Sequence, residues 1–499
     1  MSPSRRALLT GTLAGAAAVG LGRAIPSQAQ SQAEAQSLPA SHDAALHAAR
    51  RLSFGATPEL VAKVRSVGLA AWLEDQLASG PDVAAEAAVV GPGSAPLPYA
   101  ALTQLRAAGR NPVRELQGAT FARAVWGDRQ LYEVLVEVWT NHLSIASDVP
   151  GVDDHKVVDD RDVIRAHALG NFSDMLVASV QSPAMLRYLS NANSRGKKPN
   201  ENYARELLEL HTVGVHGGYQ QRDVRDAALA LTGLTVDNDT GRFLFRPEWH
   251  ATGPVRVLGW SHPNADASKG LDVALSLARY LAVHPATAQA IATKLVRRFV
   301  ADNPPAGLVA SAAKVYLAGG TAIPPVVRHI VLSADFARSS GTKAQRPYEW
   351  FSAAARALKL QQSPGHLDAV VFELGRLAQV PFGWRLPDGY PDNAQDWAST
   401  ASMLARWNTA QSLVAGGIAT FDKLDVDALV GSPVPTTAGA LADRLVTTML
   451  GVPARAALRS ALLRPSGLDA SAAVDQARVR QLAGPMAALV LSSPEAQVR

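Results

Sequence analysis

The stretch from 128 to 145 most constrains the fold of this chain. It predicts a helix that is apolar on most of its circumference, because only Glu133, Glu137 and Asn141 mark a polar strip. A helix with so narrow a polar face belongs in the centre of a large domain. His142 continues the apolar face, and a lone histidine in such a place is typical of a satisfied core residue.

The remainder of the chain carries the signals of many short helices. Of its 499 residues, 47% are apolar and only 6% aromatic, and glycine and proline punctuate the apolar runs. Thr57 followed by Pro58 is a helix start of this kind. Two short apolar runs around an Asp-Asn-Asp-Thr-Gly turn predict a β-hairpin over 234–247. The fold class we expect is mainly α, a large many-helix globular domain with this small hairpin insertion.

The first 29 residues have the build of a bacterial export leader. Arg5 and Arg6 precede a mild apolar run, and a small-x-small cleavage site ends at Ala29. This is the pattern of a twin-arginine signal peptide, so we expect an exported protein, periplasmic or extracellular. The predicted organisation is a leader (1–29), a flexible linker (30–41), a helical core domain (42–413) and a smaller C-terminal helical region (414–499).

Charge and composition exclude several classes of partner. The formal net charge of +5 falls to +2 without the three arginines of the leader, and no basic run alternates with aromatics, which argues against nucleic-acid binding. No later segment is long and apolar enough for a transmembrane helix. The chain has no cysteine, so disulfides and thiolate metal sites are excluded.

The segment 199–214 has the highest density of reactive side chains. Asn200 is a helix N-cap, Gly214 is a terminator, and Tyr203, Leu207 and Leu210 give the helix a core side. The spacing of Glu201, Arg205 and Glu209 predicts a ladder of opposite charges on another side.

Three interpretations of this segment remain open. Glu206 and His211, with Arg205 beside them, are candidates for acid–base catalysis in a cleft, where an aromatic loop with Trp384, Tyr390 and Trp397 could stack a sugar. Alternatively, His142, Glu209 and His250 are candidate ligands of a divalent metal, although the spacings of Glu206 and Glu209 from His211 place no two ligands well on one helix face. The third interpretation is structural: internal ion pairs of Glu206 and Glu209 with Arg205, Arg195 or Arg187.

Several motifs together resemble a known bacterial family. They are Arg51–Pro58, Trp139–His142, 170–172, 200–214, 218–224 and 231–233. Their order and spacing resemble the family called domain of unknown function 1800 over roughly residues 42–499. The resemblance implies an exported, largely helical protein without an established reaction, encoded beside a second exported protein of the sulfatase and phosphatase type.

One motif departs from that family. Where its pattern reads His-Asp-x-Gly-x-Lys, this chain has Ala251 and Val255 in place of the Asp and the Lys. If those two residues carry chemistry in the family, this chain lacks it.

Two functions follow from the sequence, and it does not decide between them. The first is a metal-assisted hydrolase or oxidase at the cell envelope. The second is a non-catalytic binding or assembly protein that works with another exported partner. The signatures of serine hydrolases, phosphate-binding loops, dinucleotide folds and His-Glu-x-x-His metalloproteases are absent from the sequence.

Overall fold

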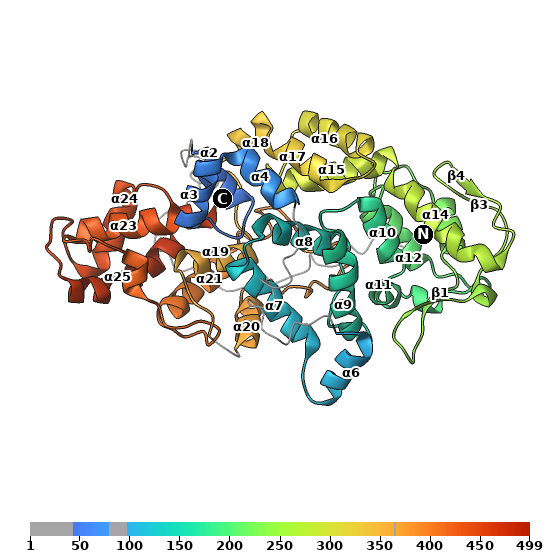
Figure 1. Ribbon diagram of the computed structural model, residues 1–499, viewed down its shortest axis with the longest axis horizontal. Coiled ribbons are helices and arrows are strands. Elements are labelled where there is room, and N and C mark those ends of the chain that lie inside the picture. The colour runs from blue at the N-terminus through green and yellow to red at the C-terminus, as the bar shows by residue number, and fades with distance from the viewer. Residues whose placement is uncertain (1–42, 79–96, 364–365) are drawn as a thin grey trace, which may run out of the picture. The chain divides into compact units, whose positions relative to one another are not determined.

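The computed structural model describes residues 43–78, 97–363 and 366–499. The predicted leader with Arg5, Arg6 and Ala29, and the predicted linker at 30–41, lie outside them. The described residues form one compact unit, within which the domain boundary expected at 413 stays a prediction. Helices dominate this unit, together with two small antiparallel sheets (Figure 1), so the mainly α prediction is confirmed. In the described ranges no helix has the length and apolarity of a membrane span.

The first half of the unit builds part of the core and carries the segment 199–214, which we call the dense segment. Its helical elements are α2 (Ala44–Arg51), α3 (Pro58–Val67), α4 (Leu69–Ala78), α6 (Tyr99–Ala107), α7 (Pro112–Trp126), α8 (Gln130–His142), α9 (Asp153–Asp159), η3 (Asp160–Arg165), α10 (Phe172–Val180), α11 (Pro183–Tyr188), η4 (Asn191–Asn193), α12 (Glu201–Glu206), η5 (Leu207–His211) and α13 (Gln221–Ala230).

Several of these helices start where the sequence places a cap. The Thr57 hydroxyl accepts a hydrogen bond from the Leu60 amide, and Pro58 takes the first position of α3, as predicted. Ser182 caps α11 in the same way, ahead of Pro183. Such caps satisfy amides that have no partner inside the helix.

Helix α8 lies in the middle of the core, as its apolar circumference predicted. Leu131, Val134, Leu135 and Trp139 are all fully buried. The helix packs against α4, α7 and η3. Figure 1 shows it surrounded by other helices. His142, at its last turn, is buried as well.

The predicted hairpin is present, and a second one follows it. Strands β1 (Leu234–Val236) and β2 (Phe243–Phe245) pair with Leu234 opposite Phe245. The hairpin of β3 (Val255–Val257) and β4 (Trp260–His262) was not predicted. Its turn holds Leu258 at φ 48° and Gly259 at φ 89°. A type I′ turn needs positive φ at both central positions and usually has Asn-Gly or Asp-Gly there. Because Leu258 takes the first position, the sequence carries no sign of this turn.

The second half is again helical. Its elements are η6 (Pro247–Trp249), η7 (Ala267–Lys269), α14 (Gly270–Ala282), α15 (Pro285–Phe299), α16 (Ala306–Ala318), α17 (Ile323–Val331), α18 (Ala334–Arg338), α19 (Pro347–Ala357), α20 (Leu367–Arg376), α21 (Thr400–Val414), α22 (Val426–Val430), α23 (Ala438–Leu450), α24 (Ala456–Leu463), η8 (Arg464–Ser466), α25 (Gln476–Ser492) and η9 (Pro494–Gln497). Helix α15 packs against α16 and α17, and α25 packs against α21 and α23.

Candidate functional site

The dense segment is a short α-helix that widens into a π-helical turn. The Asn200 side chain caps α12 by accepting from the Asn202 amide at 2.9 Å. The chain then continues as the π turn η5, and the Thr212 hydroxyl bonds the Leu207 carbonyl oxygen at 2.6 Å. The sequence predicts one regular helix up to Gly214, whereas the structure has a wider π turn after Glu206. Single π turns inside helices occur frequently at functional sites.

The inner face of the segment is buried largely as predicted. Tyr203, Leu207 and His211 are fully buried. Leu210, expected on the same face, is half-buried instead. The π turn explains this, because it accommodates an extra residue and rotates the side chains that follow.

The outer face carries the predicted charge ladder. Arg205 Nη1 lies 3.8 Å from Glu209 Oε1, and its Nη2 donates to Gln221 Oε1 at 2.9 Å. Glu209 also accepts a hydrogen bond from the Tyr219 hydroxyl. Arg205 and Glu209 therefore fasten the helix to Tyr219 and to Gln221 at the start of α13. Of the ion pairs that the structural interpretation expected, the described residues show that of Glu209 with Arg205 and none of Glu206. The catalytic and metal roles of Arg205 and Glu209 stay predictions.

Glu206 lies between the two faces and is half-buried. Burial raises the pKa of Glu206, and the carboxylates of Glu209 and Asp388 raise it further against the opposing effect of Arg205. A carboxyl group in this environment holds its proton to higher pH than an exposed one. Of the predicted catalytic residues, Glu206 therefore has the environment of a general acid.

The two histidines near the segment form a buried, neutral pair. His142 Nε2 lies 3.0 Å from the His211 carbonyl oxygen, and the two ring centroids are 6.4 Å apart. Burial and the positive charge of Lys294 lower the pKa of His211 to about 3. Burial likewise lowers the pKa of His142 well below its usual value. The ring of His211 has zero exposure, so it points into the interior from the segment and has no access to solvent.

His250 lies in a different environment. Its Nδ1 is 2.8 Å from the Thr232 carbonyl oxygen, and its Nε2 is 2.9 Å from Asn264 Oδ1. Within the ranges that the structure describes, no three His, Asp or Glu side chains are grouped so as to hold a metal ion. The metal role of His142, Glu209 and His250 gains no support from this arrangement and stays a prediction.

The aromatic loop 381–397 brings a second carboxylate toward Glu206. The Tyr188 hydroxyl donates to the Arg385 carbonyl oxygen at 2.7 Å, which holds the loop beside α11. Asp388 is exposed, and it accepts a hydrogen bond of 2.7 Å from Trp384 Nε1. The rings of Trp384 and Tyr390 are 5.1 Å apart and half-buried. The loop therefore places the oriented Asp388 carboxylate close enough to Glu206 to raise its pKa, and it presents the two aromatic rings on the same loop.

Gly389 fixes this loop on the end of α8. It has a φ of 72°, and a Cβ atom there would lie 2.1 Å from the Asn141 carbonyl oxygen. We expect Gly389→Ala to lower the free energy of unfolding by about 1–3 kcal/mol, from backbone strain and this clash. Denaturant unfolding measures the change. Gly341→Ala is the matched control, since Gly341 has φ 69° and open space around it. Equal losses in the two variants would contradict the close approach.

A cluster of buried charges at the centre of the unit was not predicted. Glu349 lies within ion-pair distance of three guanidinium groups, those of Arg298, Arg346 and Arg499. Burial alone would raise the pKa of Glu349, but these three arginines hold it well below its usual range. We call the following residues the Glu349 cluster: Glu137, Arg298, Asp302, Lys343, Arg346, Glu349, Asp392 and Arg499.

One signal of this cluster was present in the sequence. Arg346 and Glu349 are three residues apart in a helix start, a spacing that permits an ion pair. The other members come from segments that are far apart in the chain, so no local pattern connects them.

Comparison with known proteins places the chain in a family. The family profile described as "Protein of unknown function (DUF1800)" matches residues 47–498. The chain belongs to this family. The resemblance drawn from the motifs is thereby confirmed, and the DUF1800 family as described carries no reaction. No curated protein and no solved structure matches the chain.

Ala251 and Val255, where the sequence was expected to depart from the family pattern, lie just before and in the second hairpin. The Ala251 amide donates to the Thr232 hydroxyl at 2.8 Å. Val255 is 1% exposed, in β3. A lysine at position 255 would place a charge in the interior, whereas this DUF1800 member has an apolar contact there.

Proposed function

We propose that this DUF1800 protein is an exported bacterial hydrolase that cleaves an uncharged polysaccharide at the cell envelope by acid–base catalysis. The observation that carries the proposal is the half-buried Glu206, whose pKa is raised by burial and by the carboxylates of Glu209 and Asp388. Glycoside hydrolases commonly use two carboxyl groups whose different environments give them different pKa values.

The two carboxyl groups have different roles in this proposal. Glu206 keeps its proton and donates it to the oxygen of the leaving sugar. Asp388, which Trp384 orients through a hydrogen bond of 2.7 Å, acts as the carboxylate that activates water or attacks the sugar carbon. The half-buried rings of Trp384 and Tyr390 offer faces for sugar stacking. The ring of His211 is fully buried, so in this proposal it does not contact substrate.

The proposal is tested with purified protein and a panel of neutral polysaccharides, by measuring the release of reducing ends. We expect release by the unmodified protein and by Glu201→Gln, and none by Glu206→Gln. Glu201 is a suitable control because it lies on the same helix, with its carboxylate bonded to Gln221 at 2.7 Å. No release from any polymer would refute the substrate class. Equal release by both variants would refute the role of Glu206.

Export is the second part of the proposal, and it rests on Arg5 and Arg6 in the leader. We expect the double replacement Arg5→Lys and Arg6→Lys to abolish the appearance of processed protein outside the cytoplasm, because the twin-arginine pair is the recognised feature of such leaders. Cell fractionation and N-terminal sequencing measure this outcome. Normal export of the double variant would contradict a twin-arginine route, whereas Arg23→Lys serves as the control and should be exported normally.

A further inference from the structure

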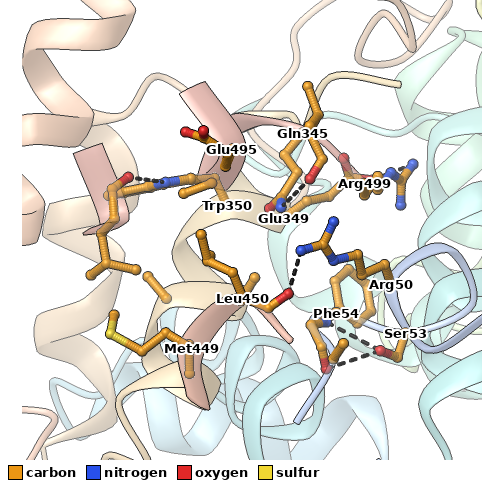
Figure 2. A pocket seen from close by; sticks show the side chains of 18 residues that line it. Arg50, Ser53, Phe54, Gln345, Glu349, Trp350, Met449, Leu450, Glu495 and Arg499 are labelled. Carbon is orange, nitrogen blue, oxygen red and sulfur yellow. Dashed lines mark hydrogen bonds and ion pairs between the residues drawn. The ribbon is translucent and has the colours of Figure 1, made fainter. Parts of the chain in front are cut away.

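A small cavity lies where the first described helix meets α19 and the last residues of the chain. It is lined by the end of α2, one face of α19, the end of α23 and the residues after α25, and its volume is about 50 Å³. Ala353, Ala354 and Ala357 of α19 line one side, and their short side chains leave the space. Figure 2 shows arginines at one end of this cavity and Phe54, Trp350, Met449 and Leu450 around it.

The polar end of the cavity has one guanidinium, that of Arg499, with a donor that no acceptor among the described residues reaches. Arg499 is 3% exposed, and within the described residues its Nε has no hydrogen-bond partner. Its Nη2 lies 3.0 Å from Glu349 Oε1, which is already shared with other arginines. Arg50 contributes a second guanidinium, which donates to the Leu450 carbonyl oxygen (Figure 2). A buried N–H without a partner is costly, so a ligand that accepts from it gains affinity.

The surroundings of the cavity carry an excess of positive charge. In the described part of this region, six buried cationic side chains stand against five carboxylates. The cations are Arg51, Arg298, Lys343, Arg346, Arg406 and Arg499, and the carboxylates are Glu137, Asp302, Glu349, Asp392 and Glu495, the last of which lines the cavity. Burial is the main cause that lowers the pKa of Arg51 to about 9 and that of Arg499 to about 10, whereas Glu137 and Glu349 raise the pKa of Arg346 against the effect of burial. A further anion in the cavity would offset this excess.

The size and the walls select the class of anion. A buried water needs roughly 10–15 Å³ of such volume, so the cavity has room for about four atoms of that size. That is the size of a carboxylate with one or two carbons beyond it. Phe54, Trp350 and Leu450 form an apolar wall, which suits a hydrocarbon end and offers nothing to the fourth oxygen of a phosphate.

We propose that this cavity binds a small aliphatic carboxylate, with Arg499 and Arg50 donating to its oxygens and the apolar wall contacting its carbon end. The site is separate from Glu206 and independent of the proposed hydrolysis. Bound there, the ligand would join α2 to α19 and to the last residues, so its binding stabilises the folded protein.

The test uses the full-length purified protein and sodium acetate, with inorganic phosphate and chloride at equal ionic strength as comparisons. We expect acetate to raise the midpoint of thermal unfolding in a saturable way, and calorimetric titration to give one site per chain. Arg499→Met should weaken acetate at least about 10-fold, the loss expected for a charged hydrogen bond. Ala354→Leu should abolish binding by filling the cavity, with the cluster charges intact.

Arg444→Met is the matched control, because Arg444 also donates to a main-chain oxygen, that of Val430 at 2.8 Å, away from the cavity. It should leave acetate binding unchanged. Phosphate acting as strongly as acetate would overturn the carboxylate assignment. An unsaturable response to acetate, or unchanged affinity in Ala354→Leu, would overturn the site itself. Ala354→Leu keeps the proposal testable if Arg499→Met does not fold.

Discussion

Replacing Glu349 by glutamine is expected to lower the free energy of unfolding by about 3–5 kcal/mol, the usual cost of removing one partner from a buried ion pair. The reason is that three guanidinium groups share the single negative charge of this carboxylate. Without its charge, the guanidinium groups of Arg298, Arg346 and Arg499 remain buried and repel one another. Denaturant unfolding followed by circular dichroism measures the loss.

Asp427→Asn removes the same charge from an exposed pair with Arg480 and is the control, for which we expect little change. The pH dependence gives an independent check. Because the folded pKa of Glu349 is depressed, its contribution is complete above the unfolded value of about 4.3 and is lost as pH falls through the folded pKa. The difference between the unmodified protein and Glu349→Gln should therefore shrink below about pH 4. A constant difference down to lower pH would contradict the ion-pair explanation.

Replacing Glu206 by glutamine is expected to lower the rate of polysaccharide hydrolysis about 10²–10⁴-fold, the contribution typical of a general acid. Glutamine keeps the shape of the side chain but has no proton to donate at that position. The free energy of unfolding should change little or rise, because burial disfavours the charged form of this carboxyl group. The measurement is the rate of reducing-end release, with unfolding curves recorded on the same samples.

The pH profile distinguishes an acid from a merely structural residue. A general acid must be protonated, so the rate falls as pH rises through its pKa. Since the pKa of Glu206 is raised above its ordinary value of 4.5, this decline should lie above that pH. Glu206→Gln should lose the decline together with most of the rate, while Glu201→Gln keeps both. An unchanged profile in Glu206→Gln would assign the decline to another group.

The sequence predicted those parts of the fold that depend on local pattern. The apolar circumference of α8 predicted its burial, and the Thr57–Pro58 pair predicted the start of α3. The first hairpin was likewise visible from its turn. The π turn η5 was not, because its register depends on what packs against Leu207 and His211 rather than on the residues themselves.

The candidate site could be predicted only in part. Glu206 stood out because of the charges around it in the sequence, but its raised pKa depends first on burial, then on Glu209, and last on Asp388, which lies far along the chain. The sequence did not predict the Glu349 cluster, because its members also lie far apart along the chain. Arg298 and Arg499 reach Glu349 from different segments, and buried arginines do not differ from exposed ones in a single sequence.

The contacts of Arg51 make completion of this fold a late event. Its guanidinium donates to the main-chain oxygens of Val300, Ser339 and Arg499, so one hydrogen bond spans 448 residues. Contacts of such sequence separation form slowly, because the intervening chain must first be ordered. During synthesis this hydrogen bond can therefore form only after the whole segment from Arg51 to Arg499 has been made.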